Sequence, residues 1–224
     1  MAEEVPLRLH YSAELEQLSL QAEMMGVLVD ENLERMRDVL RTGDLVLAER
    51  AISADDTIDD MNVSLTERCY ELLRREAPVA GDLRLIVSVL RVTSEFERIG
   101  DLSLRVCKLA PEHRLLTLAP RSFDILLTMA DDALHRFREA LRAWSAMDEA
   151  LAEQVANEVR VNFSTQQLVE SMLSYDGPEA VPAALNTLVA GQALDRITDH
   201  AAILGARVRY LITGDPTHLA AEVR

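Results

Sequence analysis

The apolar residues of this chain recur every three or four positions over long stretches, which is the spacing of one face of an α-helix. Gly, Pro or Thr-Gly-Asp segments, which end helices, separate six such stretches. They predict helices over residues 7–40, 44–76, 82–111, 122–145, 148–175 and 179–212. The third stretch has the strictest rhythm, on a seam formed by Val89, Val92, Phe96, Ile99, Ser103, Val106 and Ala110. A seam of this kind requires partner helices.

A short motif occurs twice and divides the chain into two halves. Glu97 and Asp101 in the first copy are each 98 positions before their counterparts in the second copy, Asp195 and Asp199. We interpret this as a tandem duplication, with one repeat over residues 1–114 and another over residues 115–224. Short loops make sequential helices antiparallel neighbours. The predicted fold is all-α, with six long antiparallel helices in two tandem pseudo-symmetric three-helix bundles.

Composition supports this prediction and limits the partners. Aromatic residues make up only 4% of the 224 residues, and 8 Gly and 7 Pro are few, which favours long helices over sheets. A net charge of −15 would repel a phosphate backbone, so we expect no nucleic acid partner. The start lacks the features of a signal peptide, and the longest uncharged run, residues 180–194, is shorter than the roughly 20 residues that span a bilayer. We therefore expect a cytoplasmic protein.

Several residues with chemical potential are better explained by packing. Cys69 and Cys107 stand singly inside helical patterns, so we interpret both as core residues. Trp144 lies at helical spacing and is also expected in the core. Only His200 of the five histidines adjoins an acidic motif, and we expect it to face solvent or pack between helices.

The repeated acid pairs lie on otherwise apolar helix faces, where carboxylates must be paired, metal-bound or open to water. Two clusters of candidate metal ligands are Asp55, Asp59, Glu97 and Asp101 in the first repeat, and Glu158, Asp195 and Asp199 in the second. Oxygen-only ligands suit Mg²⁺, Mn²⁺ or ferric iron. The alternative is a water-filled groove in which Arg98, Arg105 and Arg196 bind the acids.

No catalytic constellation accompanies these acids. The sequence has no Gly-rich phosphate loop and no Ser-His-Asp or Cys-His arrangement. No Glu stands three residues before a His, which disfavours a ferritin-like di-metal oxidase. We therefore predict a binding protein that is not an enzyme.

Several segments together resemble one family. They are residues 54–59, 78–84 and 95–101 in the first repeat, and residues 157–162, 194–201 and 210–215 in the second. Over nearly its whole length the chain resembles the PhoU family, accessory regulators of bacterial phosphate uptake. In that family the third helix of each repeat carries an acid-x-x-x-acid signature.

The resemblance implies a cytoplasmic regulator that links a phosphate ABC transporter to the sensor histidine kinase of the phosphate regulon. The implied partners are that kinase and the ATPase subunit of the transporter, and signalling is repressed when phosphate is plentiful. It also implies a homodimer that reaches the membrane only through its partners. The alternative is a helical protein-interaction scaffold of another pathway, whose acid clusters bind no metal.

The sequence also departs from the family pattern. Arg105 and Ile203 stand where family members often have Asn, Thr198 replaces a usual Gly, and Asp195 is shorter than the usual Glu. Arg105 is one helical turn beyond Asp101 and could neutralise it. We predict that the first cluster binds a divalent or ferric ion more readily than the second.

Overall fold

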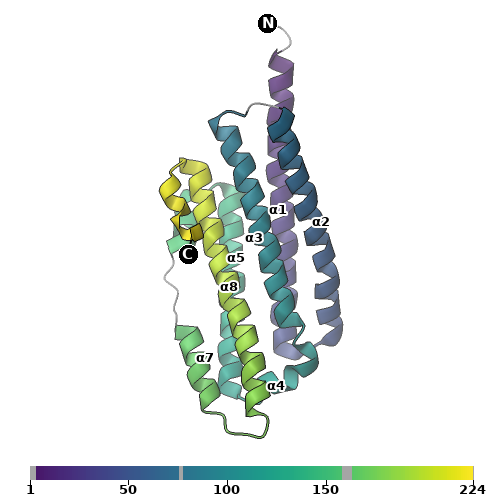
Figure 1. The fold of residues 1–224 in the computed structure, drawn as a ribbon, viewed down its shortest axis with the longest axis vertical. Helices are drawn as coiled ribbons and strands as arrows, with labels where there is room; N and C mark the ends of the chain where they lie inside the picture. Colours follow the sequence, from purple (N-terminus) through teal and green to yellow (C-terminus); the bar gives the residue numbers. More distant parts are fainter. Residues whose placement is uncertain (1–3, 76–77, 158–162, 224) are drawn as a thin grey trace.

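The computed structural model describes residues 4–75, 78–157 and 163–223, and every regular element in them is helical. The first half contains three long helices, α1 (Glu4–Thr42), α2 (Leu45–Arg75) and α3 (Ala80–Cys107). Figure 1 shows them side by side along the long axis of the molecule. The predicted all-α fold is confirmed, and α3 ends four residues before the predicted limit.

A short segment then leads into the second half through the 3₁₀ helix η1 (Ala110–Glu112) and α4 (His113–Thr117). The second half comprises α5 (Pro120–Ala146), α6 (Glu149–Asn157), α7 (Phe163–Leu173), α8 (Ala180–Thr213) and the 3₁₀ helix η2 (Pro216–Val223). The predicted helix over residues 148–175 thus corresponds to α6 and α7, with residues 158–162 outside the described part. The repeat boundary predicted after residue 114 falls inside α4 and stays a prediction.

The predicted stops are built from glycines with left-handed backbone. Gly43 has φ of 70° and Gly214 has φ of 72°, conformations that a side chain disfavours. Directly after Gly43, the Asp44 carboxylate accepts hydrogen bonds from the backbone N–H groups of Val46 and Leu47, at 2.8 and 3.0 Å. This N-cap begins α2 as the sequence predicts.

The core follows the predicted seams. Every residue of the α3 seam is buried, and the apolar stripe of α1 is buried from Leu15 to Leu40. Cys69, Cys107 and Trp144 also lie in this core, which confirms the interpretation of these three residues as packing groups. Burying these apolar faces is the main driving force for the fold.

The two halves pack directly against each other. Helix α3 lies along α8, and α1 lies along α5. The rings of Phe96 and Phe137 meet edge to face, with centroids 5.8 Å apart. The Arg138 guanidinium donates to both carboxylate oxygens of Asp30, at 2.6 and 3.0 Å, and also to Glu34. These contacts join α5 to α3 and α1, and α8 packs on both α3 and α5, which positions the groove described below.

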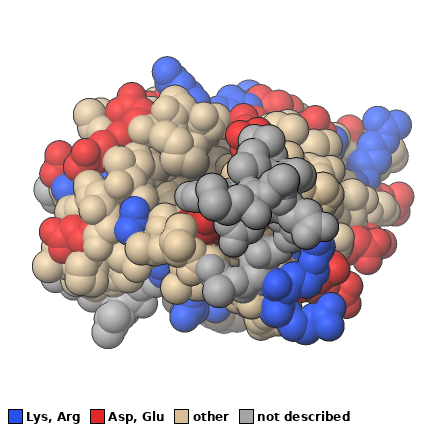
Figure 2. All heavy atoms as spheres, turned by 90° about the horizontal axis from the view of Figure 1, so that it is seen from above, with Lys and Arg blue, Asp and Glu red and all other residues tan. Residues whose placement is uncertain are grey.

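Acidic and basic side chains are interspersed on the surface, as Figure 2 shows for the end of the molecule nearest the N-terminus. This mixed surface matches the dispersed Lys and Arg of the sequence. Among the described helices, none combines the length and apolar character needed to cross a bilayer.

Candidate functional site

Helices α2 and α3 bring the four acids of the first predicted cluster together. Asp55 and Asp59 are one turn apart on α2, and Glu97 and Asp101 are one turn apart on α3. The two helices pack along each other. Burial, and then repulsion by Asp59, Asp101 and Glu97, raises the pKa of Asp55, so these acids lie within electrostatic range of Asp55.

Asp55 lies deepest in this acid cluster, with 6% of the residue exposed. Its Oδ1 is buried and has no hydrogen-bond partner. Gly100 on α3 makes room for this oxygen, because a Cβ on Gly100 would lie 2.8 Å from it. An unpaired buried carboxylate oxygen is costly, so this position favours a proton or a cation.

The other acids of the cluster lie nearer the surface than the sequence pattern indicates. Glu97 is partly exposed, and Asp59 and Asp101 are exposed. Glu97 and Asp101 lie apart from the buried face of α3, which is formed by the Val89 to Val106 seam, and are open to water, one of the three states expected of them. The acid buried at depth comes from α2 instead.

The pKa values follow from burial and mutual repulsion. Burial is the largest cause that raises the pKa of Asp55 to about 6, and Asp59, Asp101 and Glu97 add to it. Burial and then Asp101 raise the pKa of Asp59. Burial, Asp101 and Asp59 raise the pKa of Glu97, against a smaller lowering by Arg98. The cluster thus carries charge that its own surroundings disfavour.

Arginines do not relieve this repulsion by direct contact. Arg98 forms its ion pair with Glu95, at 2.7 Å. Arg105, which the sequence places within reach of Asp101, forms no ion pair with it. Within the described part of the chain, no Lys or Arg forms an ion pair with any of the four acids. The side chains therefore do not form the arginine contacts of the alternative interpretation at the first cluster.

The side chains as they lie do not form a finished metal site. In residues 4–75, 78–157 and 163–223, no group of three or more His, Cys, Asp or Glu is arranged to hold an ion. The acids that would have to turn inward are the exposed Asp59 and Asp101. The chemistry of the donors fits a hard cation, for which the buried Asp55 oxygen would be the ligand already in a fixed position.

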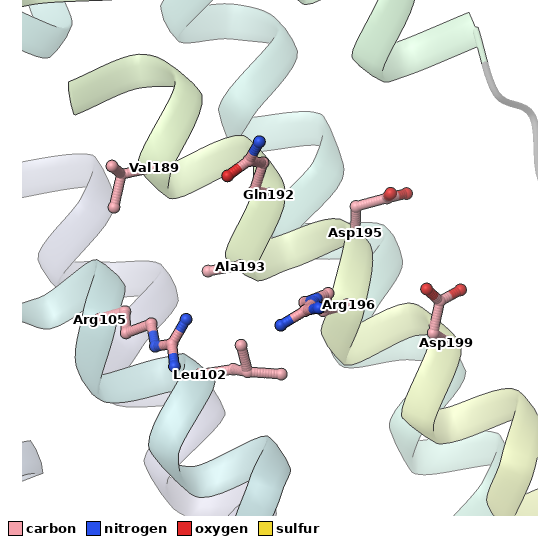
Figure 3. Close-up of a pocket in the computed structure, with 8 residues that line it drawn as sticks. All are labelled: Leu102, Arg105, Val189, Gln192, Ala193, Asp195, Arg196 and Asp199. Atoms are coloured by element: carbon pink, nitrogen blue, oxygen red, sulfur yellow. The ribbon is translucent and has the colours of Figure 1, made fainter. Parts of the chain in front are cut away.

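The second acid pair lies beside a groove between α3 and α8. This groove has a volume of about 490 Å³ and is lined by Leu102, Arg105, Val189, Gln192, Ala193, Asp195, Arg196 and Asp199. In Figure 3 the side chains of Arg105 and Arg196 extend into the space between the two helices. The carboxylates of Asp195 and Asp199 point to the other side of α8.

The second cluster is only partly described. Glu158, its third predicted ligand, lies outside the described residues. Thr198 stands where the first repeat has Gly100, and its hydroxyl donates to the Leu194 carbonyl at 3.0 Å. The second repeat therefore has a side chain at the position that leaves space for Asp55 in the first.

Glu95 and His200 form a contact that the sequence analysis missed. The His200 Nδ1 lies 2.5 Å from Glu95 Oε2, which joins α3 to α8. Glu95 is buried, and His200 is partly buried. This agrees with the expectation that His200 packs between helices. The duplication offers one signal of this contact in the sequence. The counterpart of Glu95 in the second repeat is Ala193, so Glu95 is not part of the repeated motif.

Comparison with known proteins extends across both halves. A sequence model of the PhoU domain matches residues 23–110 and 126–208. The phosphate-specific transport system accessory protein PhoU homolog of Pseudomonas aeruginosa is 30% identical over 213 residues, covering 93% of this chain and 88% of that protein. The phosphate-specific transport system accessory protein PhoU of Escherichia coli is 26% identical over 207 residues, covering 91% of this chain and 86% of that protein.

Solved structures agree with the fold. The crystal structure of PhoU from Pseudomonas aeruginosa matches with a TM-score of 0.86 and 30% identity, covering 92% of this chain and 100% of that chain. The phosphate transport system regulatory protein PhoU from Streptococcus pneumoniae matches with a TM-score of 0.81 and 23% identity, covering 92% of this chain and 98% of that chain. The second likeness supports the fold alone.

Proposed function

Because the chain belongs to the PhoU family, we propose that it is a cytoplasmic, non-enzymatic regulator of phosphate uptake and signalling. In this role it links the ATPase subunit of a phosphate ABC transporter to the sensor histidine kinase of the phosphate regulon. It represses signalling when phosphate is plentiful. The observation that carries this proposal is the family match over both repeats, in a chain whose relatives are named as accessory proteins of phosphate-specific transport.

The shape of the molecule suits a protein that works by contact. Its long helices present extended faces to solvent, and Val181, Leu185 and Val189 form an exposed apolar stripe on α8. Such faces can receive partner helices or a second copy of the chain. The proposal therefore includes a homodimer that reaches the membrane only through its partners.

The test of this role is deletion of the gene, followed by a phosphate-starvation reporter in phosphate-rich medium. We expect the reporter to rise in the deletion strain and to fall again when the wild-type gene is restored. An unchanged reporter would contradict the proposed role. It would favour the alternative, a helical scaffold of another pathway.

The proposal also includes a divalent or ferric ion, Mg²⁺, Mn²⁺ or iron, at Asp55, Asp59, Glu97 and Asp101. The unpaired buried oxygen of Asp55 and the raised pKa values of Asp55, Asp59 and Glu97 support this assignment. A bound cation would supply the positive charge that no ion-paired Lys or Arg brings to these four acids. The protein's own contribution is to hold the Asp55 carboxylate at a fixed depth beside Gly100.

The second cluster, Asp195 and Asp199 with Glu158, is proposed as a weaker site for the same ions. Two arginines lie close by, since Arg105 and Arg196 line the same groove as Asp195 and Asp199. Their positive charges would oppose a second cation. We therefore expect the first cluster to fill before the second as ion concentration rises.

A further inference from the structure

Two arginines of different repeats face one groove. Arg105 belongs to the last turn of α3, and Arg196 lies in the middle of α8. Both line the groove of about 490 Å³ between these helices. Figure 3 shows both guanidinium groups extending into the space between the helices, with Leu102 beside them. Because α3 and α8 pack along much of their length, the fold fixes the backbone positions of these two exposed residues relative to each other.

Neither guanidinium has an ionic partner in the described part of the chain. Other arginines of this chain do form ion pairs, as Arg98 does with Glu95. Arg105 and Arg196 form no such pair, although the chain carries a net charge of −15. Asp195 and Asp199 line the same groove, but their carboxylates point to the other side of α8 in Figure 3. The two arginines are therefore not ion-paired, although they share the groove with two carboxylates that point away from them.

The geometry selects the kind of anion that would fit. A carboxylate has two oxygens, and the fork of a single guanidinium can satisfy both. Two guanidinium groups that approach from opposite helices can instead bind different oxygens of one tetrahedral anion, and their two charges match a dianion. Gln192 lines the same groove and carries an amide that can donate to a further oxygen.

The negative net charge of the protein does not prevent such binding. At physiological ionic strength, charges more than about 8 Å away are largely screened in solvent, so the nearest groups dominate at an open groove. The nearest groups extending into this groove are the two guanidinium groups, while Leu102 and Val189 supply apolar walls. Asp195 and Asp199 are the nearest carboxylates that would oppose an anion, and in Figure 3 they point to the other side of α8.

We infer that the groove between α3 and α8 is a binding site for a tetrahedral dianion of the phosphate class, held between Arg105 and Arg196. The choice of phosphate among such dianions rests on the proposed function. The ligand is inorganic phosphate or a phosphoryl group on a larger molecule, since both present the same oxygens. The site joins the two repeats, so its occupancy would bear on the contact between α3 and α8.

The test uses the full-length protein, treated with a chelator and then freed of it, so that a metal cannot bridge to phosphate. Inorganic phosphate, O-phosphoserine and acetate are titrated separately at constant ionic strength. Binding is followed by calorimetry and by the NMR signals of the arginine Nε–H groups. The variants are Arg105→Gln and Arg196→Gln. Arg142→Gln is the control, because it removes the same charge from an exposed arginine of α5 outside the groove.

We expect phosphate or phosphoserine to bind more tightly than acetate and to shift two arginine signals. Each groove variant should weaken binding about tenfold, the equivalent of one charge-assisted hydrogen bond, while the control binds like the wild type. Tighter binding of phosphate identifies the free ion as the ligand, and tighter binding of phosphoserine identifies a phosphorylated partner.

Two results would overturn the inference. One is binding of both phosphate and phosphoserine no tighter than that of acetate, and the other is equal binding by the groove variants and the control. Circular dichroism of each variant shows whether its helices are intact. These measurements use purified protein, so their failure is distinct from an unchanged reporter in the deletion strain.

Discussion

Replacing Asp55 by Asn tests whether the first acid cluster stores unfavourable charge. Asn keeps the shape of the side chain and removes its ionisation. In the wild type, burial and four neighbouring acids raise the pKa of Asp55 from its usual 3.8 to about 6. The folded protein therefore disfavours the ionised carboxylate, and Asn relieves this in the absence of a cation.

The magnitude follows from the pKa. A tenfold change in proton affinity corresponds to about 1.4 kcal/mol, so ionised Asp55 lowers the free energy of unfolding by about 3 kcal/mol. Because the folded-state pKa lies above the unfolded value, the folded protein binds more protons between pH 3.8 and about 6. Stability is therefore lost as the pH rises through this window, and the loss is complete above it. Asp55→Asn lacks this loss.

The assay is urea unfolding followed by circular dichroism, in chelator, at steps from about pH 4 to pH 8, the range that brackets the expected loss. Wild type and Asp55→Asn should be of similar stability at the acidic end. At the upper end the variant should be more stable, by up to about 3 kcal/mol. Asp56→Asn is the matched control, since Asp56 is exposed and contributes least of the four neighbouring acids to the raised pKa of Asp55, so this variant should retain most of the pH dependence.

Adding Mn²⁺ should reverse the order. A cation that binds the folded wild type stabilises it by about 4.1 kcal/mol at a thousandfold excess over its dissociation constant. This exceeds the loss of about 3 kcal/mol from ionised Asp55, and Asp55→Asn should gain much less. If Asp55→Asn and Asp56→Asn show the same pH dependence in chelator, Asp55 does not carry the buried charge. The reasoning from its unpaired oxygen would then be refuted.

Three further changes test other parts of the structure. Asp101→Asn should weaken metal binding, measured by metal analysis after dialysis, and leave the helices intact, measured by circular dichroism. Equal, near-zero metal in this variant and the wild type would contradict the metal proposal. Gly205→Ala should lower the free energy of unfolding by about 1–3 kcal/mol, because the new Cβ would lie 2.8 Å from the backbone of α6, whereas Gly81→Ala meets no atom within 4 Å and should not destabilise. His200→Ala should cost about 1–2 kcal/mol by removing a partner of the buried Glu95, and a smaller loss in urea unfolding would show that Arg98 alone satisfies that carboxylate.

The sequence by itself determined the helices and their buried faces. The spacing of apolar residues in the third predicted helix, from Val89 to Ala110, predicted seven buried residues, and all seven are buried. The stops at Gly43 and Gly214 were also predictable, because a left-handed residue ends a helix locally. These features depend on neighbours within a turn or two of the chain, so the chain's own periodicity specifies them.

The candidate ligands were predictable only as a set. Spacing placed Asp55 with Asp59 and Glu97 with Asp101, and the packing of α2 on α3 does bring them within electrostatic range. The sequence did not show which acid is buried. Periodicity gives the angle of a side chain about its own helix, whereas burial depends on which neighbouring helix covers that angle.

Tertiary structure alone decided the contacts between repeats. Arg105 was expected to be within reach of Asp101 along α3, yet it extends into the groove toward α8, where Arg196 also extends. Glu95 finds His200 on α8, 105 positions away in the chain. Both arrangements depend on how α3 and α8 are placed against each other. That placement follows from burying the apolar faces of all the long helices together, which no single stretch of sequence specifies.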